Sequence, residues 1–402
     1  MQAQTEPLTI CDKEHYEFLA KCASTASPSK WNDWRKNKRE VQLDGANLAG
    51  LNLRGFDLSK CRLRKAQFQN TQLERVDFSG ALLEDANFYE ADLTGAQFSG
   101  AELKNAYFFK SNVSDADFIG AKLTNASFTL ATLDRSKFVG AILTGAVGSK
   151  SSFKFVTFGT ANLQGTRFED SHFNGTSFYR TNLHAATLTG SHFQEADLTE
   201  TDLTGADLRF AIIDGATLLH HCKIDLNTDC RGVGLDNARI DVSIKEVLKH
   251  NIRRKEWQQW YLQHSILKWP VSLFWNVSAY GSSTGRILFI ATLTALFFSL
   301  LYLFLPDLTI NLHSIQGTQL PLGIVIVRAI YFSVVTMSTL GFGDVSANPF
   351  SFWGHIVVTL QVLSGYLLFG TIITRLGILF VGGGPFEKKS KVEDNDTNAN
   401  AA

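Results

Sequence analysis

The chain is poor in cysteine, methionine and proline, and it has no surplus of charge of either sign. Among its 402 residues are 5 cysteines, 2 methionines and 7 prolines, and 38 basic residues balance 38 acidic ones. Cysteines that are few and odd in number argue against a disulfide framework and fit a reducing compartment. The balanced charge provides no basic surface for nucleic acid, so we expect no nucleic-acid partner.

Also missing is the basic and then apolar stretch of a secretory signal at the N-terminus. We therefore expect the N-terminal half of the chain to stay in the cytosol. The mean hydropathy of -0.01 hides two unlike halves. A polar repeat covers residues 41–220, and long apolar runs follow residue 286.

Residues 41–220 divide into consecutive blocks of five without an insertion. The third residue of each block, up to Leu218, is Leu, Phe, Val or Ile, except at Gly148. A mostly small residue stands two positions before it. A period of five matches neither the 3.6 of a helix nor the 2 of a flat strand. Two inward positions in five instead indicate a coil of short straight faces separated by corners.

A longer period indicates how many faces each coil has. Every twentieth position from 43 to 203 is Leu, and the positions from 78 to 178 at the same spacing are Phe. Columns that keep their identity every twenty residues predict four faces per coil, with like residues stacked on like in one continuous core. Gly148 leaves one core position empty, so we expect a local cavity or a bulge there.

These blocks resemble the pentapeptide-repeat family, whose pattern is A-(D/N)-L-x-x. Ala46-Asn47-Leu48 fits the pattern directly, and so do the blocks that begin at 91, 161 and 206. The resemblance implies a right-handed quadrilateral β-helix of about nine coils over residues 41–220. Some members of the family are thought to imitate DNA, but that requires a strongly acidic surface, and the acidic excess of these repeats is weak.

Both ends of such a rod need covers. Residues 1–40 are expected to form a helical cap, with Trp31 in a short aromatic helix. Residues 222–241 are expected to be irregular and to close the last coil. Four side chains here could be zinc ligands or ordinary capping residues: His220, His221, Cys222 and Cys230.

Residues 221–285 form a predicted cytoplasmic linker with many aromatic and basic side chains. A helix is expected over 243–267, with Arg253, Arg254 and Lys255 at its middle and Trp257 and Trp260 beyond. Because tryptophan favours the headgroup level of a bilayer, this pattern favours a helix lying at the membrane interface. The alternative is an amphipathic helix packed on the rod.

Residues 286–381 contain two apolar runs long enough to cross a bilayer, 287–305 and 352–381. The second run is interrupted by His355, Gln361 and Arg375. The stretch between them is too polar for a third span. We expect a pore helix and an extended segment over 322–344, buried in protein or lining a water-filled cavity. The polar residues 382–402 are predicted to be a disordered tail.

Basic residues flank the two runs, whereas residues 306–320 contain no Lys or Arg. By the positive-inside rule, this places both termini in the cytoplasm. The chain is therefore expected to be a multi-pass protein of the plasma (inner) membrane, with residues 306–320 facing outward.

Residues 339–344 read T-L-G-F-G-D. A potassium filter needs successive carbonyl oxygens that replace the hydration shell of the ion, and glycine accepts the left-handed dihedrals that this requires. Residues 329–344 closely resemble the pore helix and filter of potassium channels with two spans per subunit. The resemblance implies that the filter binds K+ at the first four of these residues and closes with the fifth: Thr339, Leu340, Gly341, Phe342 and Gly343. It further implies that Asp344 anchors the outer mouth, and that Tyr331 and Phe332 brace the filter.

Two residues depart from the family pattern. Leu340 stands where Val or Ile is usual, and Val335 stands where some members carry a glutamate that pairs with the filter aspartate. Both departures concern the stability of the filter more than its choice of ion.

One chain supplies one filter strand, so a homotetramer around a fourfold axis is implied. In the second span, Gly365 and Gly370 are either gating hinges or points of close helix packing. Arg375 either extends to the cytoplasmic interface or forms a ring at the inner mouth.

The chain is thus expected to be a mixed membrane protein: a pentapeptide-repeat β-helix followed by an α-helical, two-span potassium-channel pore in the lipid bilayer. The predicted function is potassium conduction without enzymatic activity or a cofactor. The repeats would serve assembly or regulation, with a possible cytosolic ligand or protein partner. Two alternatives stay open, a poorly selective cation channel and a membrane-tethered interaction scaffold.

Overall fold

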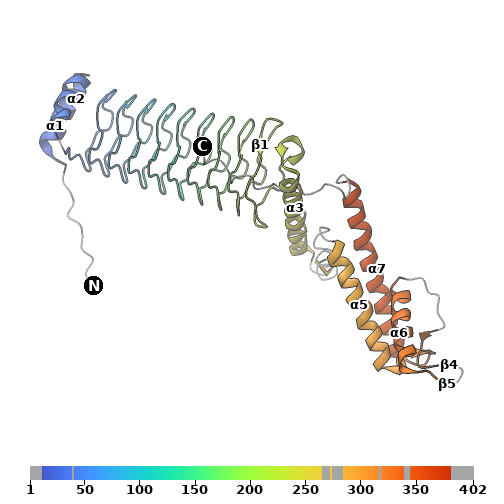
Figure 1. The fold of residues 1–402 in the computed structure, drawn as a ribbon. Helices are drawn as coiled ribbons and strands as arrows, with labels where there is room; N and C mark the ends of the chain where they lie inside the picture. Colours follow the sequence, from blue (N-terminus) through green and yellow to red (C-terminus); the bar gives the residue numbers. More distant parts are fainter. Residues whose placement is uncertain are drawn as a thin grey trace, which may run out of the picture. The chain divides into compact units, whose positions relative to one another are not determined.

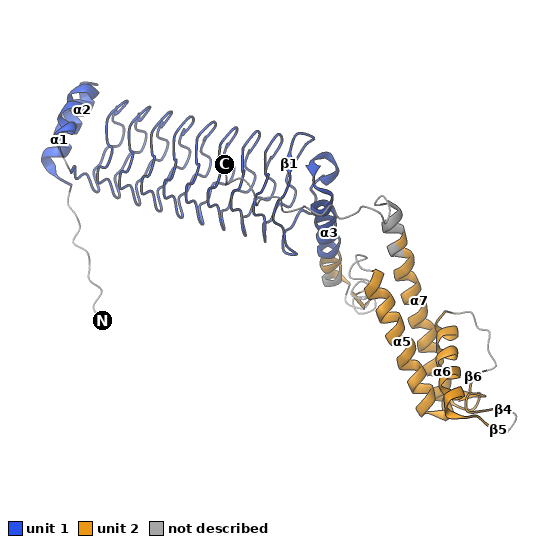
Figure 2. Ribbon diagram, in the orientation of Figure 1, with its two compact units in different colours: residues 1–256 blue, residues 257–402 orange. Residues whose placement is uncertain are grey.

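The protein is described from a computed structural model, which covers residues 11–38, 40–264, 272–273, 284–315, 318–338 and 345–381. The chain separates into two compact units, which Figure 2 colours differently. The repeat unit comprises residues 1–256, and the helical unit comprises residues 257–402.

The repeat unit is a four-sided parallel β-helix. Isolated parallel bridges join residues twenty apart along its whole length, from the pair Gln42 and Arg62 to the pair His192 and Ile212. The coils stack in a single row (Figure 1). This spacing confirms the fold that the twenty-residue columns predict.

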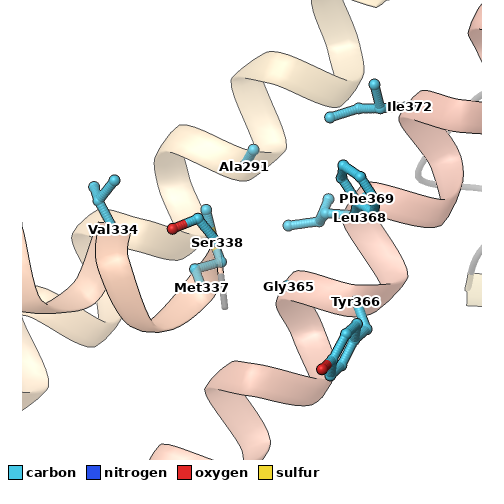
Figure 3. Close-up of a pocket in the computed structure, with 9 residues that line it drawn as sticks. All are labelled: Ala291, Val334, Met337, Ser338, Gly365, Tyr366, Leu368, Phe369 and Ile372. Atoms are coloured by element: carbon cyan, nitrogen blue, oxygen red, sulfur yellow. The ribbon is translucent and has the colours of Figure 1, made fainter. Parts of the chain in front are cut away.

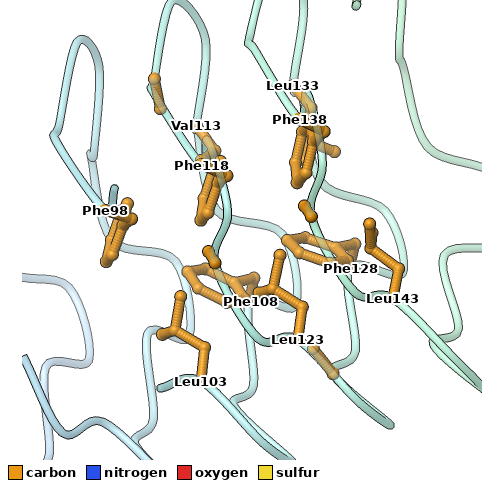
Figure 4. Packing of buried hydrophobic residues seen from close by; sticks show 14 of the residues in the cluster. Phe98, Leu103, Phe108, Val113, Phe118, Leu123, Phe128, Leu133, Phe138 and Leu143 are labelled. Carbon is orange, nitrogen blue, oxygen red and sulfur yellow. The ribbon is translucent and has the colours of Figure 1, made fainter. Parts of the chain in front are cut away.

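The core of the repeat unit consists of stacked Leu and Phe side chains (Figure 4). Phe98, Phe118 and Phe138 belong to one column, and their ring centroids lie 4.7 and 4.6 Å apart. Phe108 belongs to the neighbouring column and meets Phe118 edge-on at 6.1 Å. Both arrangements are favourable for aromatic rings, so each coil supports the next through the same few contacts.

The polar positions of the repeat form its corners. The Asp or Asn that precedes the central residue accepts a hydrogen bond from the backbone N–H two residues on, as in Asp92 to Thr94 at 3.1 Å. The fifth residue of most blocks has a left-handed φ, such as 69° at Gly95 and 58° at Asn105. The side-chain hydrogen bond accounts for the Asp or Asn of the A-(D/N)-L-x-x pattern, and glycine, which accepts left-handed dihedrals at low cost, stands at many of the fifth positions.

The cavity or bulge expected at Gly148 is absent. A Cβ built on Gly148 would lie 2.7 Å from Cδ1 of Phe168 and 3.3 Å from Cζ of Phe153. The ring of Phe168, from the following coil, thus occupies the space that a side chain at 148 would take.

The five-residue period ends before the β-helix does. Bridges continue beyond His220, to Lys223 and Asp229, but at spacings of more than twenty residues. One residue is inserted before Thr217, which is fully buried, so Leu219 rather than Leu218 points into the core. The prediction that Leu218 points inward is therefore wrong, and the β-helix extends beyond the predicted end at residue 220.

Helices cover the first coil. The expected helix around Trp31 is α2 (Pro28–Lys36), and a second helix, α1 (Lys13–Ser24), packs beside it. Trp31 is fully buried, and its Nε1 donates a hydrogen bond to the backbone oxygen of Asp57 at 2.7 Å. The apolar end of the core is thereby shielded from water.

The other end is closed by η1 (Leu235–Asn237), by the parallel pair β1 (Leu218–Leu219) and β2 (Arg239–Ile240), and by α3 (Val242–Gln263). The cysteines point into the core here, and burial raises the pKa of the Cys222 and Cys230 thiols to about 12. Within the described residues, no group of three metal-ligating side chains occurs. Both cysteines are buried at the end of the core, as expected for capping residues.

The histidines beside them bind Asp241. Nδ1 of His220 lies 2.8 Å from Oδ1 of Asp241, and the backbone N–H of His221 donates to Oδ2 at 2.6 Å. Partial burial alone would raise the pKa of the Asp241 carboxyl, but these two partners hold it below its usual value.

The interfacial assignment is wrong for the first part of α3, which packs on the repeat unit. Ile244, Leu248 and Asn251 are buried. Nδ2 of Asn251 donates to the backbone oxygens of Asp225 and Thr228 at 2.7 and 3.2 Å. Arg254 and Lys255 also donate hydrogen bonds to backbone oxygens of the loop at 226–227.

The aromatic part of α3 belongs to the helical unit. The ring of Trp260 stacks on His264 at 4.2 Å and meets Trp257 at 5.4 Å. The residues that follow, 265–271 and 274–283, lie outside the described part, so an interfacial position of this region stays a prediction.

In the described part of the helical unit, α5 (Thr284–Phe304), α6 (Leu322–Met337) and α7 (Phe352–Val381) pack on one another. Two of them, α5 and α7, contain apolar stretches long enough to cross a membrane. Between α5 and α6 lie η2 (Pro306–Leu308), β3 (Thr309–Ile310), β4 (Ser314–Ile315) and β5 (Thr318–Gln319). Strand β3 pairs antiparallel with β6 (Ser346–Ala347), and β4 pairs with β5.

Replacing Gly148 by alanine should destabilise the repeat unit by about 1–3 kcal/mol, because the new methyl group overpacks the core against Phe168. The matched control is Gly159→Ala, where a Cβ would meet no atom closer than 3.9 Å. Thermal unfolding of both full-length variants, followed by circular dichroism, checks the difference. An unchanged Tm for Gly148→Ala would contradict the filled core.

Replacing Asn251 by alanine should loosen the last coil, because the buried backbone oxygen of Thr228 and the partly buried one of Asp225 lose their donor at a cost of about 1–3 kcal/mol. Hydrogen exchange should quicken over residues 217–240 and stay unchanged over residues 60–120. The control is Glu246→Ala, an exposed position on the same helix. Equal exchange in both variants would contradict the capping role of α3.

Candidate functional site

The predicted filter lies outside the described residues, but both of its flanks are defined. Residues 339–344 follow Ser338, which caps the C-terminal end of α6 with hydrogen bonds to the oxygens of Thr336 and Val334. They precede Val345, which is buried in the core of the helical unit. The ion-binding roles of Thr339, Leu340, Gly341, Phe342 and Gly343, and the anchoring role of Asp344, stay predictions.

The two predicted bracing residues of α6 differ in their exposure. Phe332 is 7% exposed and packs on the ring of Tyr302 from α5, with centroids 5.0 Å apart. Tyr331 is 52% exposed in the single chain. The structure thus places Phe332 in the contact between α6 and α5. Bracing of the filter by either residue stays a prediction.

Val335 lies half-buried on α6, and its backbone oxygen accepts a hydrogen bond from Oγ of Ser338 at 3.0 Å. An apolar side chain at 335 leaves this turn without a carboxylate. The effect of this substitution on the stability of the filter stays a prediction.

The segment after the filter is fixed to the segment after α5. In addition to the pairing of β3 with β6, the backbone N–H of Asn348 donates to the oxygen of Leu308 at 3.0 Å, and its Nδ2 donates to the oxygen of Asp307 at 3.1 Å. A Cβ built on Gly354 would lie 2.5 Å from the same Leu308 oxygen. The start of α7 therefore lies directly against this turn.

Arg328 ties the same region to α6. Its Nη2 donates a hydrogen bond to the backbone oxygen of Asn311 at 2.7 Å. The basic residue that interrupts the apolar sequence of α6 thereby holds the loop after α5 in place.

A buried polar network, here named the three-helix bracket, joins α5, α6 and α7. It consists of Tyr302, Ser333 and Gln361, whose exposure is 0% in each case. Oη of Tyr302 donates to Oε1 of Gln361 at 2.6 Å. Nε2 of Gln361 donates to the backbone oxygen of Ser333 at 2.9 Å and contacts its Oγ at 2.7 Å. Oγ of Ser333 donates to the oxygen of Ala295 on α5 at 2.7 Å.

The sequence offers only a weak sign of this network. Gln361 and Ser333 appear there as polar interruptions of apolar runs, and Tyr302 appears as one more aromatic residue in a span. Because membrane helices bury polar side chains only where partners exist, the interruptions could have been paired with each other. The sequence does not indicate which residues would meet.

Gly365 lies one turn beyond Gln361 on α7. A Cβ built on it would overlap the carbonyl oxygen of Met337 and lie 2.8 Å from the carbonyl carbon. The absence of a side chain therefore lets the backbone of α7 contact the last turn of α6. Close packing explains this glycine, and the hinge role stays a prediction.

The other two candidates of the second span lie further along α7. Gly370 is half-buried, and its role as a hinge stays a prediction. The side chain of Arg375 lies outside the described part, and so does its position at the inner mouth.

An apolar hollow of ≈ 270 Å³ opens beside Gly365 (Figure 3). Ala291 of α5 borders it on one side, and α7 contributes Phe369 and Ile372 on the other. The end of α6, with Met337 and Ser338, also borders it. The single chain thus leaves an apolar space next to the last residues before the filter.

Carboxylates are scarce in this part of the chain. Between residues 286 and 381 the sequence has only two carboxylates, Asp307 and Asp344. Several polar groups of the described helices bind one another or backbone oxygens, as the three-helix bracket does. The arrangement can hold a backbone segment rigidly at membrane depth.

Comparison with known families agrees with both units. A model of pentapeptide repeats matches 8 copies within residues 42–80, 72–108, 111–147, 151–190 and 181–218. A model described as ion channel matches residues 287–382. The chain joins pentapeptide repeats to an ion channel domain. The predicted fusion of the two families and its fold class are thereby confirmed.

Solved structures resemble the repeat unit of this channel-domain protein. HetL, a pentapeptide repeat protein involved in heterocyst differentiation regulation from the cyanobacterium Nostoc sp. strain PCC 7120, is 22% identical, with 52% of this chain and 93% of HetL covered and a TM-score of 0.34. A trypsin-treated form of QnrB1, a plasmid-mediated fluoroquinolone resistance protein, is 21% identical over 53% of this chain and 93% of QnrB1, with a TM-score of 0.30.

Replacing Gly365 by alanine should separate α7 from α6, because the methyl group overlaps the Met337 carbonyl. Since backbone atoms must move, we expect a loss of about 2 kcal/mol or more. The control is Gly323→Ala, where no atom lies within 4 Å of the added Cβ. Thermal unfolding of the full-length protein in detergent compares them. A hinge that is not closely packed would instead tolerate Gly365→Ala with an unchanged Tm.

Proposed function

We propose that the protein is a potassium-selective channel in which four copies surround a filter formed by residues 339–343. The observation that carries the proposal is the sequence T-L-G-F-G-D at 339–344. It follows the short apolar helix α6 and precedes β6, which pairs with β3. Successive carbonyl oxygens of this sequence would replace the hydration shell of the ion.

The length of α6 supports a re-entrant segment. Its 16 residues extend about 24 Å, which is less than the hydrocarbon thickness of about 30 Å. A helix of this length ends inside the membrane, and the chain after it needs protein or water around it. The C-terminal end of a helix carries a partial negative charge, so the end of α6 at Ser338 would favour a cation beside the filter.

The exposed faces of the helices support an oligomer in a bilayer. In the single chain, large apolar side chains of α7 stay exposed, among them Leu363 at 57%, Tyr366 at 59% and Phe369 at 62%. Such a surface needs lipid or other subunits to cover it. A homotetramer with a fourfold axis along the pore meets both needs.

Both termini are proposed to be cytoplasmic in the plasma (inner) membrane, as the flanking basic residues indicate. The repeat unit is then a cytoplasmic domain with a role in assembly or regulation, and a cytosolic ligand or protein on the rod would be the regulator. The mechanism requires no cofactor and no enzymatic step, since K+ is the permeant ion.

Ion flux into liposomes that contain the full-length protein tests the proposal. We expect K+ flux to exceed Na+ flux by more than about tenfold, because carbonyl coordination favours the less strongly hydrated ion. The control is Gly341→Val, whose branched side chain disfavours left-handed dihedrals and should abolish the flux without preventing membrane insertion.

Two results would contradict the proposal. Equal K+ and Na+ flux would favour the poorly selective cation channel. A correctly inserted protein that conducts neither ion under any condition, but captures a defined cytosolic protein through its repeats, would favour the membrane-tethered scaffold.

A further inference from the structure

Gln361 has an unusual position for a glutamine, since it is fully buried within a helix that has the length and composition of a membrane span. A buried amide without partners costs several kcal/mol in an apolar medium. Both the oxygen and the nitrogen of this amide therefore need hydrogen-bond partners. Two other helices supply them, α5 through Tyr302 and α6 through Ser333.

One partner of Gln361, Ser333, lies on the helix that leads to the predicted filter. The amide nitrogen of Gln361 binds the backbone oxygen of Ser333, and this oxygen belongs to α6. Ser333 precedes the predicted filter by less than two helical turns. One turn further along α7, Gly365 contacts Met337 at the end of α6. Helix α7 is thus fixed to α6 at two successive turns.

The two attachments differ in kind. At Gly365 the contact is steric, because the backbones of α7 and α6 meet there through van der Waals contact. Such a contact does not oppose sliding of one helix along the other. At Gln361 the attachment is directional, because its amide binds both the oxygen and the hydroxyl of Ser333. The hydroxyl of Tyr302 fixes the other side of the amide and prevents its rotation. The bracket therefore determines the register between α6 and α7.

We propose that Gln361 is a positioning residue for the ion filter. Its amide transmits movements of the inner helix α7 to the pore helix α6, and in the resting position it holds the filter in its conducting form. This inference rests on the proposed channel function. It assigns the coupling to a residue that never touches the ion.

Loss of the Gln361 amide should change how often the filter closes. Without the amide, α6 can shift against α7, and the filter backbone loses part of its support. Bound K+ opposes collapse of the filter because the carbonyl oxygens need a cation between them. Closures of a channel without the bracket should therefore become frequent when external K+ is low, and rare when it is high.

The test compares single-channel recordings of full-length Gln361→Met and Leu360→Met in bilayers at low and high external K+. Methionine preserves the length of the glutamine side chain but removes both polar ends. Leu360 is the neighbouring residue on α7, and it is 54% exposed. At low K+, we expect Gln361→Met to raise the ratio of closed to open time about tenfold, which corresponds to about 1.4 kcal/mol. The ratio should return towards the wild-type value at high K+, and Leu360→Met should match the wild type at both concentrations.

A second variant keeps the test decisive if Gln361→Met does not assemble. Ser333→Ala retains the backbone oxygen that accepts from Gln361 but loses the hydroxyl and its bond to Ala295. It should show the same dependence on K+ with a smaller amplitude.

The dependence on K+ separates positioning from simple stability. A purely structural role would lower the Tm of Gln361→Met and Ser333→Ala while their closures stay independent of K+, and this result would overturn the proposal. Failure of the channel function itself would look different, because wild type, Leu360→Met and Gln361→Met would then all lack K+ current.

Discussion

Polar groups inside a bilayer find no water, so the protein itself must satisfy them. This constraint governs the helical unit. Tyr302, Ser333 and Gln361 are fully buried, and they use one another and the oxygen of Ala295 as partners. Because each comes from a different helix, the packing of α5, α6 and α7 has one register in which these groups are paired.

The core of the repeat unit is instead built by repetition. Backbone hydrogen bonds between coils and stacked Phe and Leu side chains recur every twenty residues. Such an array is stable only when its ends are covered. Trp31 closes one end through its ring and its bond to Asp57, and Asn251 closes the other through two backbone oxygens.

Periodic features could be predicted from the sequence, and singular contacts could not. The Leu and Phe columns predict the faces of the β-helix because the same residue types recur at the same positions in every coil. The cavity or bulge predicted at Gly148 is absent because the ring of Phe168, twenty residues away, occupies its place. The shift at Leu218 results from one inserted residue where the pattern is already fading. The same holds for the candidate site. The motif at 339–344 can be recognised in the sequence, but the partners of Gln361 depend on how three helices pack.

We propose that four chains hold K+ between the carbonyl oxygens of residues 339–342. The most direct measurement is a cryo-electron microscopy map of the full-length protein in lipid nanodiscs with K+. The account predicts a fourfold axis surrounded by four copies of α6 and α7, with a row of ion density on the axis at residues 339–342. A monomer or dimer in which these residues surround no ion would contradict it.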